Sequence, residues 1–372
     1  PNPDPAVPPP PDFVRPEIRA ERAYRVPTTL VADAKVDQNE SPYDLPDEIK
    51  RAALDAFAAT PWNRYPDDRP HRLVRAIEER EGLPAGSVIV GRGSNELTHT
   101  LGLCFVDAGT PVVLPSPMFA LFASMARMHG ADVVDVPAGP DLRHDADAIL
   151  AAAVDANAPL VVVTTPNNPT GQTIPHADLD RLAAGVPGVL VIDEAYHEFL
   201  GGRTATDLLK AHDNVLVMRT FSKAFGLAGV RLGVMLGHPD LIAEIEKSRL
   251  PFLVDRLGEE IGLAILDRPD LLGERVAELM AERAAQEAWF AAQEGVEVLP
   301  GVANFFLIRT PLAPRALMEA MAAHGVLIRD VSGYPALAGR DGRPGWVRVS
   351  IGAPAENEAV RPAFSAVLCL PA

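Results

Sequence analysis

The sequence predicts an α/β protein in which a large domain, with a mostly parallel mixed sheet flanked by helices, is joined to a smaller α+β domain. Short β-branched apolar runs recur from Ser87 onward without alternating with polar residues, as expected of strands buried on both faces. Helix-like stretches separate these runs, which favours right-handed parallel crossovers. After about Pro251 the pattern changes to a long charged helical stretch followed by further strand-like runs.

The expected elements follow in chain order. Strands are predicted at 88–90, 112–114, 160–163, 189–192 and 215–218, with helices between them such as 145–153 and 178–184. A long helix is predicted over 268–293, and strands over 304–308, 326–329 and 346–350. The domains expected from this pattern are a proline-rich disordered arm at 1–13, a segment at 14–45 that contributes to the small domain and to dimer contacts, a large ligand-binding domain at 46–255 and a small C-terminal domain at 256–372.

Composition excludes several classes of protein. The 372 residues contain 34 Lys and Arg against 50 Asp and Glu, a net charge of −16 that repels nucleic acids and anionic membranes. An anionic ligand must therefore be held by local positive groups. Two cysteines, Cys104 and Cys369, form neither a disulfide framework nor a zinc motif. No apolar run approaches the roughly 20 residues that span a bilayer, and no signal peptide is recognisable, so we expect a cytoplasmic protein.

The segment after the run at 215–218 contains Lys223 among Phe, Ala, Gly and Leu. Burial of an ammonium is costly unless its pKa falls, and a lowered pKa is what a Schiff-base lysine requires. The alternative is a lysine that extends to solvent. Eight residues later comes Arg231, which together with the hydroxyls of Thr220 and Ser222 could hold a phosphate. These residues indicate an aldehyde cofactor with a phosphate group.

Polar residues that follow other strands extend this pattern. Ser94 and Asn95 open a helix after a glycine-rich turn, where free backbone N–H groups could bind the same phosphate. Asp193 ends one strand and could keep a pyridine nitrogen protonated. The remaining candidates are Tyr196 and Asn168, for the ring oxygen, and Phe119, for stacking on the ring. Taken singly, each has an ordinary structural explanation as a turn, a strand end or a core residue.

The joint pattern is more specific than its parts, because the Asn turn, the Asp strand end, the Ser-Lys loop and the Arg follow their own strands in a fixed order. From about Val14 to the end, the chain resembles fold-type I aminotransferases of the class I/II group, which use pyridoxal 5′-phosphate (PLP). More narrowly, it is similar to the histidinol-phosphate aminotransferase family in four segments: 36–42, which contains Asn39, 63–67, 329–331 and 347–352.

This resemblance implies a PLP-binding large domain, transamination between histidinol phosphate and 2-oxoglutarate in histidine biosynthesis, and a homodimer with shared active sites. It also implies that Tyr65 reaches the cofactor phosphate of the neighbouring subunit and that Tyr24 lies near the substrate. The chain departs from the family pattern at Phe119, where many relatives have Tyr, and at Ser94-Asn95, where Ala-Asp is often found.

Two arginines are candidates for binding the substrate. Arg348 and Arg329 lie in apolar strand-like runs, where an unpaired guanidinium is costly, so each is expected to meet an anion. An internal salt bridge is the alternative for each. Asn39 and Asn304 are further candidates for contacts with the substrate. In this hypothesis Lys223, once released from the cofactor, moves the proton between the substrate carbon and the cofactor.

Other functions compete with this interpretation. The same fold could carry an aromatic or other amino-acid aminotransferase, or a PLP decarboxylase of a phosphorylated amino acid. A nicotinamide dehydrogenase is disfavoured because Glu96 stands where the third glycine of its fingerprint belongs. A non-catalytic binding module would be expected to lack Lys223 or Asp193, and both are present.

Overall fold

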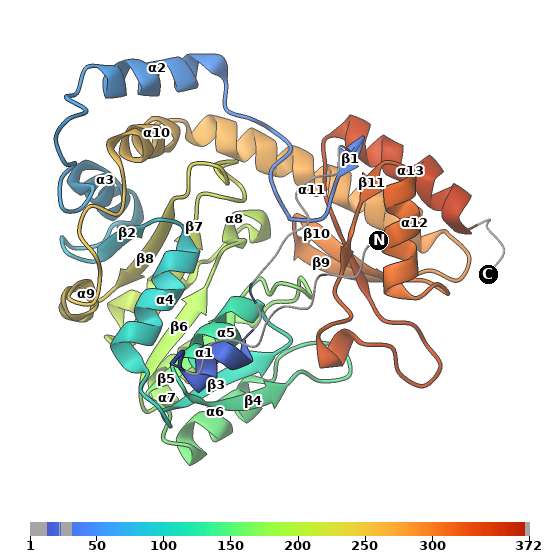
Figure 1. Ribbon diagram of the computed structural model, residues 1–372, viewed down its shortest axis with the longest axis horizontal. Coiled ribbons are helices and arrows are strands. Elements are labelled where there is room, and N and C mark those ends of the chain that lie inside the picture. Colours follow the sequence, from blue (N-terminus) through green and yellow to red (C-terminus); the bar gives the residue numbers. More distant parts are fainter. Residues whose placement is uncertain (1–12, 22, 24–31, 369–372) are drawn as a thin grey trace.

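The computed structural model describes residues 13–21, 23 and 32–368, and Figure 1 shows a large sheet with its helices beside a smaller domain. The large sheet has seven strands. In spatial order they are β2 (Val88–Gly91), β8 (Gly233–Gly237), β7 (Val215–Thr220), β6 (Val189–Asp193), β5 (Leu160–Thr164), β3 (Pro111–Ser116) and β4 (Asp132–Pro137). The pairs that β8 forms with β2 and β7 are antiparallel, and the other four pairs are parallel, which confirms the predicted mostly parallel mixed sheet.

Helices cover both faces of this sheet. Successive strand residues point to opposite sides, and because both sets of side chains are apolar, both faces need to be shielded from water. Leu160 and Val162 pack in a cluster with α4 (Ser94–Phe105), α5 (Ala120–Met128) and α9 (Pro239–Glu246). Val161 and Val163 belong to the opposite cluster. That cluster includes side chains of α2 (Asp47–Ala58), α3 (His71–Glu81), α6 (Ala146–Asp155), α7 (His176–Gly185) and α10 (Arg256–Leu266). Continuous apolar runs are therefore required in the central strands.

The small domain contains a four-stranded antiparallel sheet. Its order is β12 (Arg329–Asp330), β13 (Val347–Ser350), β10 (Phe305–Arg309) and β9 (Glu297–Ala303). Helices α11 (Pro269–Ala291), α12 (Pro314–Ala323) and α13 (Pro354–Leu368) contribute to its apolar core. The shorter elements are α1 (Pro16–Ala20), α8 (His197–Leu200) and the 3-10 helices η1 (Ala205–Lys210) and η2 (Pro335–Leu337).

The N-terminal segment joins the small domain through strand pairing. Strand β1 (Ala34–Lys35) lies parallel to β11 (Val326–Leu327), and Ser350 N donates to Val36 O at 2.9 Å. The strand expected over 326–329 is split into β11 and β12, because Ile328 belongs to neither sheet. Helix α10 packs against α2 and α3, so we propose a domain boundary after Leu266 and not at 255. Among the described residues, no helix has the length and apolar composition needed to cross a membrane.

Candidate active site

The candidate site lies where the carboxyl ends of β5, β6 and β7 face the small domain, which is where ligands bind in open α/β sheets. Asp193 ends β6, Thr220 ends β7, and Asn168 lies just beyond β5. Tyr196 and Ala224, which follow β6 and β7, pack in the apolar cluster of the small domain. The site is therefore built by both domains.

Lys223 lies in the loop after β7, in the position expected from its sequence. Its Nζ donates a hydrogen bond of 3.0 Å to Gln38 O and lies 5.8 Å from the centre of the Tyr196 ring. Burial, reinforced by the positive charge of Arg348, lowers the pKa of the Lys223 amine to about 8. A substantial fraction of this amine is therefore neutral near pH 7.5 and can act as a nucleophile or as a base.

Asp193 is buried at the end of β6, with 8% of its surface exposed. Its Oδ1 accepts a hydrogen bond of 3.0 Å from Ala195 N. Burial raises the pKa of the Asp193 carboxyl to about 7, even though this hydrogen bond and the charge of Lys223 act in the opposite direction. A carboxylate held in this way is stabilised by a bound cation, such as a protonated ring nitrogen.

A buried hydrogen-bond network joins the N-terminal segment to both domains. Asn39 Nδ2 donates to the Tyr196 hydroxyl at 2.9 Å, and Asn39 Oδ1 accepts from Ser350 Oγ at 2.7 Å. Asn304 Nδ2 donates to Asn39 O at 3.3 Å. Asn39 adopts a left-handed conformation with φ of 54°, which asparagine tolerates better than most residues. Burial raises the pKa of Tyr196 to about 12, so its hydroxyl stays protonated at neutral pH.

The two candidate substrate arginines are register partners on β12 and β13, where Arg329 lies opposite Arg348. The Arg348 guanidinium donates to Asn168 Oδ1 at 2.6 Å and to Asp37 O at 2.7 Å, and it lies over the Phe305 ring at 5.4 Å. Arg329 is half-buried. Two guanidinium groups on one face of an antiparallel pair form a positive site that suits an anionic ligand.

A second cationic corner contains Arg231. Its Nη1 donates to Ala228 O at 3.0 Å and lies 3.4 Å from Ser222 Oγ. Gly93, with φ of 76°, lies directly against this guanidinium, because a Cβ at that position would fall 2.6 Å from Arg231 Nη2. Helix α4 starts immediately after Gly93, and among the described residues no side chain caps its first N–H groups. These N–H groups and Arg231 together can hold a phosphate.

Several of the other residues expected from the sequence lie near Arg231. Thr220 Oγ1 accepts from Ser222 N at 3.1 Å, beside Arg231, and Ser94 is the first residue of α4. Asn95 is exposed on the same first turn. Phe119 precedes α5 and packs edge-to-face on Phe122 with ring centres 6.4 Å apart. The stacking of Phe119 on a cofactor ring stays a prediction.

One of the expected tyrosines, Tyr65, lies at the surface of the chain. Tyr65 is 79% exposed and stacks on Phe252 with ring centres 4.9 Å apart, on the surface of the chain. An exposed position leaves the Tyr65 side chain open to the expected contact with a neighbouring subunit. Tyr24 lies outside the described residues.

Three further residues contribute to the site, namely Gln38, Phe305 and Ser350. Gln38 acts through its backbone carbonyl, which no residue pattern encodes. Phe305 contacts both the Tyr196 ring, at 5.2 Å between ring centres, and the Arg348 guanidinium. Ser350 lies two residues after Arg348 on β13, so the alternation of a strand could have placed the two side chains on one face.

The donor set fits pyridoxal phosphate. Lys223 offers an amine of lowered pKa to the aldehyde, Asp193 a carboxylate to the ring nitrogen, and the corner around Arg231 a cradle for the phosphate. Enzymes of fold type I hold their cofactor in this way at the carboxyl edge of such a sheet. The fold and the site therefore define a PLP-dependent enzyme of fold type I.

Comparisons with known proteins narrow this class. A family model described as aminotransferase class I and II matches residues 34–367, and the chain belongs to this family. Histidinol-phosphate aminotransferases from Chlorobaculum parvum and Chlorobaculum tepidum are 38% and 36% identical over 346 residues, which cover 93% of this chain and 96% and 97% of theirs. The crystal structure of histidinol-phosphate aminotransferase from Sinorhizobium meliloti in complex with pyridoxal-5′-phosphate has a TM-score of 0.85 and 28% identity, and the match covers 96% of this chain and 98% of that one.

Proposed function

We propose that this chain is a histidinol-phosphate aminotransferase, which transfers an amino group between histidinol phosphate and 2-oxoglutarate in the biosynthesis of histidine. The curated relatives support this choice, because they carry that name and match nearly the whole chain. The opposed arginines on β12 and β13 support an anionic substrate. With a net charge of −16, the protein needs such a local cationic site to hold an anion.

Each cofactor-binding residue has a proposed role at the bound PLP. Bound PLP supplies a pyridinium ring that accepts electrons from the substrate carbon as a proton leaves it. Asp193 holds the ring nitrogen in its protonated state. Tyr196 donates its hydroxyl proton to the ring oxygen, because that hydroxyl already accepts from Asn39 Nδ2. Arg231 and the first turn of α4 bind the phosphate, and Phe119 stacks on the ring.

Lys223 has two proposed roles, as the attachment point of the cofactor and as the group that moves the proton. Its Nζ has a pKa of about 8, so near neutral pH it can accept the proton from the substrate α-carbon and deliver it to carbon C4′ of the cofactor. The carbonyl of Gln38 accepts a hydrogen bond from this amine and holds it at the site when it is free. Both proton transfers then use the same nitrogen atom.

The opposed arginines explain how one pocket can take two different substrates. Arg348 is fixed by Asn168 and by the Asp37 carbonyl, so its guanidinium is pre-oriented for a carboxylate. Arg329, on the facing strand, binds either the second carboxylate of glutamate or the phosphate of histidinol phosphate. Asn39, which is bound by Ser350 and Asn304, completes the polar wall of the pocket together with Asn304.

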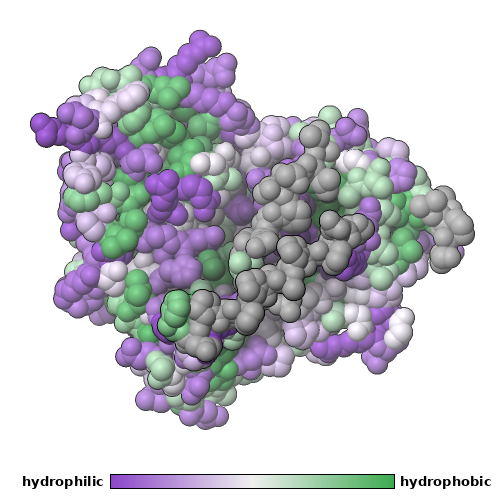
Figure 2. Space-filling view, in the orientation of Figure 1, coloured by the Kyte–Doolittle hydropathy of each residue, from purple (hydrophilic) through white to green (hydrophobic). Residues whose placement is uncertain are grey.

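We also propose a homodimer in which Tyr65 completes the site of the partner. The surface near Tyr65 carries a second stacked pair, Phe57 and Trp62, with ring centres 5.0 Å apart. Trp62 and Leu250 are 69% and 71% exposed, which is unusual for such large apolar side chains. Figure 2 shows apolar atoms gathered over the part of the surface where α2 and α10 lie. A second copy of the chain would remove these groups from water.

The opposed pair of Arg329 and Arg348 is the observation that carries the substrate assignment. A half-reaction screen of the purified PLP-bound protein tests the substrate assignment by following the visible absorbance of the cofactor. Histidinol phosphate and glutamate should each bleach this absorbance, while phenylalanine and tyrosine should act far more slowly. Bleaching by an aromatic amino acid but not by histidinol phosphate would reject the assignment.

A further inference from the structure

A buried ion pair links the two strand ends that carry Asp193 and Lys223. Glu194 directly follows Asp193, and Arg219 lies one residue before Thr220 and four before Lys223. Their strands are parallel neighbours, and Glu194 N donates to Met218 O at 2.8 Å. A contact between these two side chains therefore fixes the carboxylate corner of the site relative to the lysine loop.

The geometry of this ion pair is tight. Arg219 Nε and Nη2 donate to Glu194 Oε2 at 3.1 and 3.0 Å, and Ala205 N donates to Glu194 Oε1 at 2.6 Å. Thr204 Oγ1 accepts from Arg219 and donates to Glu194 Oε2 at 2.8 Å. Arg219 and Glu194 are 8% and 4% exposed. Bulk water therefore screens this pair little.

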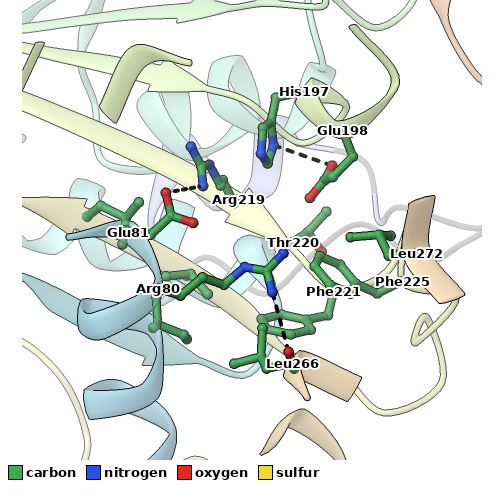
Figure 3. Close-up of a pocket in the computed structure, with 13 residues that line it drawn as sticks. Arg80, Glu81, His197, Glu198, Arg219, Thr220, Phe221, Phe225, Leu266 and Leu272 are labelled. Carbon is green, nitrogen blue, oxygen red and sulfur yellow. Dashed lines mark hydrogen bonds and ion pairs between the residues drawn. The ribbon is translucent and has the colours of Figure 1, made fainter. Parts of the chain in front are cut away.

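Arg219 also forms an ion pair with a second carboxylate, that of Glu81, through its other terminal nitrogen. Figure 3 shows Glu81, from the end of α3, directed at Arg219 beside His197 and Glu198, and Nη1 lies 2.9 Å from Glu81 Oε2. Burial alone lowers the pKa of Arg219, but the carboxyl groups of Glu194, Glu81 and Glu198 outweigh it and raise that pKa above its usual value. Arg219 is therefore a permanent cation between two carboxylates.

Two further titratable groups of this cluster, Glu198 and His197, are uncharged near pH 7. Burial raises the pKa of Glu198 to about 8 and lowers that of His197 to about 3, so their 3.3 Å contact joins two neutral groups. Arg80, which lines the same cavity of about 60 Å³, donates to Leu266 O at 3.4 Å. Near Asp193, the charge of Glu194 raises the pKa of the Asp193 carboxyl, whereas the charge of Lys223 lowers it.

We propose that Arg219 is a positioning residue of the aminotransferase, which acts through Glu194 to hold Asp193 as an anion at the cofactor ring nitrogen. Arg219 fixes and neutralises Glu194, whose charge otherwise opposes ionisation of the neighbouring Asp193. It touches neither substrate nor cofactor. This inference rests on the proposed role of Asp193, which the variant Asp193→Asn tests separately by its own effect on the cofactor spectrum.

The experiment measures the pH at which the visible absorbance of the bound cofactor changes. Arg219→Met removes a cation and should raise this midpoint, while Glu194→Gln removes an anion and should lower it, each by about one pH unit. Arg219→Lys, which keeps the charge, should stay close to the wild type. A purely structural role would move all three variants in one direction or not at all. Arg181→Met, at an exposed ion pair with Asp147, is the matched control.

The double variant Arg219→Met/Glu194→Gln tests whether Arg219 acts through Glu194. The shift caused by Arg219→Met should fall below half of its original size when Glu194 is already Gln, because the group that Arg219 holds is gone. We also expect kcat to fall by at least tenfold in Arg219→Met with KM changed less than threefold. Circular dichroism and cofactor stoichiometry check that each variant is folded and loaded. Equal shifts in both backgrounds, or shifts of the same sign in both single variants, would overturn the proposal.

Discussion

Arg329 and Arg348 lie directly opposite each other on the antiparallel strands β12 and β13. Side chains at such positions share one face with Cβ atoms about 5 Å apart, where like charges repel. An anion bound between them relieves that repulsion. We expect Arg329→Ala to raise KM for histidinol phosphate by about 10- to 100-fold, the loss of one charge-assisted contact, with a smaller effect on kcat.

Arg329→Ala also tests how the opposed arginines affect the stability of the substrate-free protein. Because Arg329→Ala removes one of two opposed cations, the melting temperature of the substrate-free protein should not fall. Arg315→Ala, at an exposed arginine on α12, is the control and should leave KM unchanged. A normal KM in Arg329→Ala would refute the role of this arginine in binding the substrate.

The phosphate corner is tested by Gly93→Ala. Both Gly93 and Gly109 have a left-handed φ, 76° and 80°, but a Cβ would strike Arg231 Nη2 only at Gly93 and would meet nothing within 4 Å at Gly109. Each substitution should cost about 1–2 kcal/mol of stability through backbone strain. Only Gly93→Ala should also weaken PLP binding, by about 100-fold, measured as the dissociation constant of the cofactor. Equal affinities for PLP in the two variants would show that Gly93 is not part of the phosphate site.

Asp193 gives the cofactor-free protein a specific pH dependence. Its pKa rises from 3.8 unfolded to about 7 folded, so between these values the folded state binds the extra proton. Stability from this group is present at low pH and is lost as the pH rises through 7. From pH 5 to 7, the unfolding free energy of the wild type should fall relative to Asp193→Asn by about 2 kcal/mol. Urea unfolding measures this difference, and a constant difference would contradict the account.

The shared site of the proposed dimer can be tested by complementation. Tyr65→Ala and Lys223→Ala should each be nearly inactive, since each lacks a part that the other retains. After unfolding and refolding together, half of the dimers are mixed, and each mixed dimer has one complete site. Activity should therefore return to about one quarter of the wild-type level. Recovery near zero, with mixed dimers detected by native mass spectrometry, would show that Tyr65 acts within its own subunit or not at all.

Much of the fold follows from the sequence because the central strands are buried on both faces. The runs at 160–163 and 189–192 each extend by one residue in the structure, to Thr164 and Asp193. Strand β4 was missed because it lies at the sheet edge and includes Asp132 and Asp135 among its apolar residues. Strand β8 was missed because glycine at both ends, Gly233 and Gly237, leaves only a short apolar run.

The candidate site was predictable where each residue follows its own strand. Lys223, Asp193 and Asn168 come together because parallel strands end at the same edge of the sheet. The contact of Lys223 with Gln38 could not be anticipated, since it uses a backbone carbonyl 185 residues away. This contact depends on where the segment around β1 packs in the folded chain. Local patterns of residues in the sequence do not encode such a long-range contact.

The central claim is that Lys223 Nζ is the atom that binds PLP covalently. Reduction of the PLP-bound protein with borohydride, followed by proteolysis and mass spectrometry of the labelled peptide, tests it most directly. We predict one pyridoxyl group per chain, on Lys223, and none on Lys247, an exposed lysine of the same domain. A label on another lysine, with Lys223 unmodified, would contradict the account.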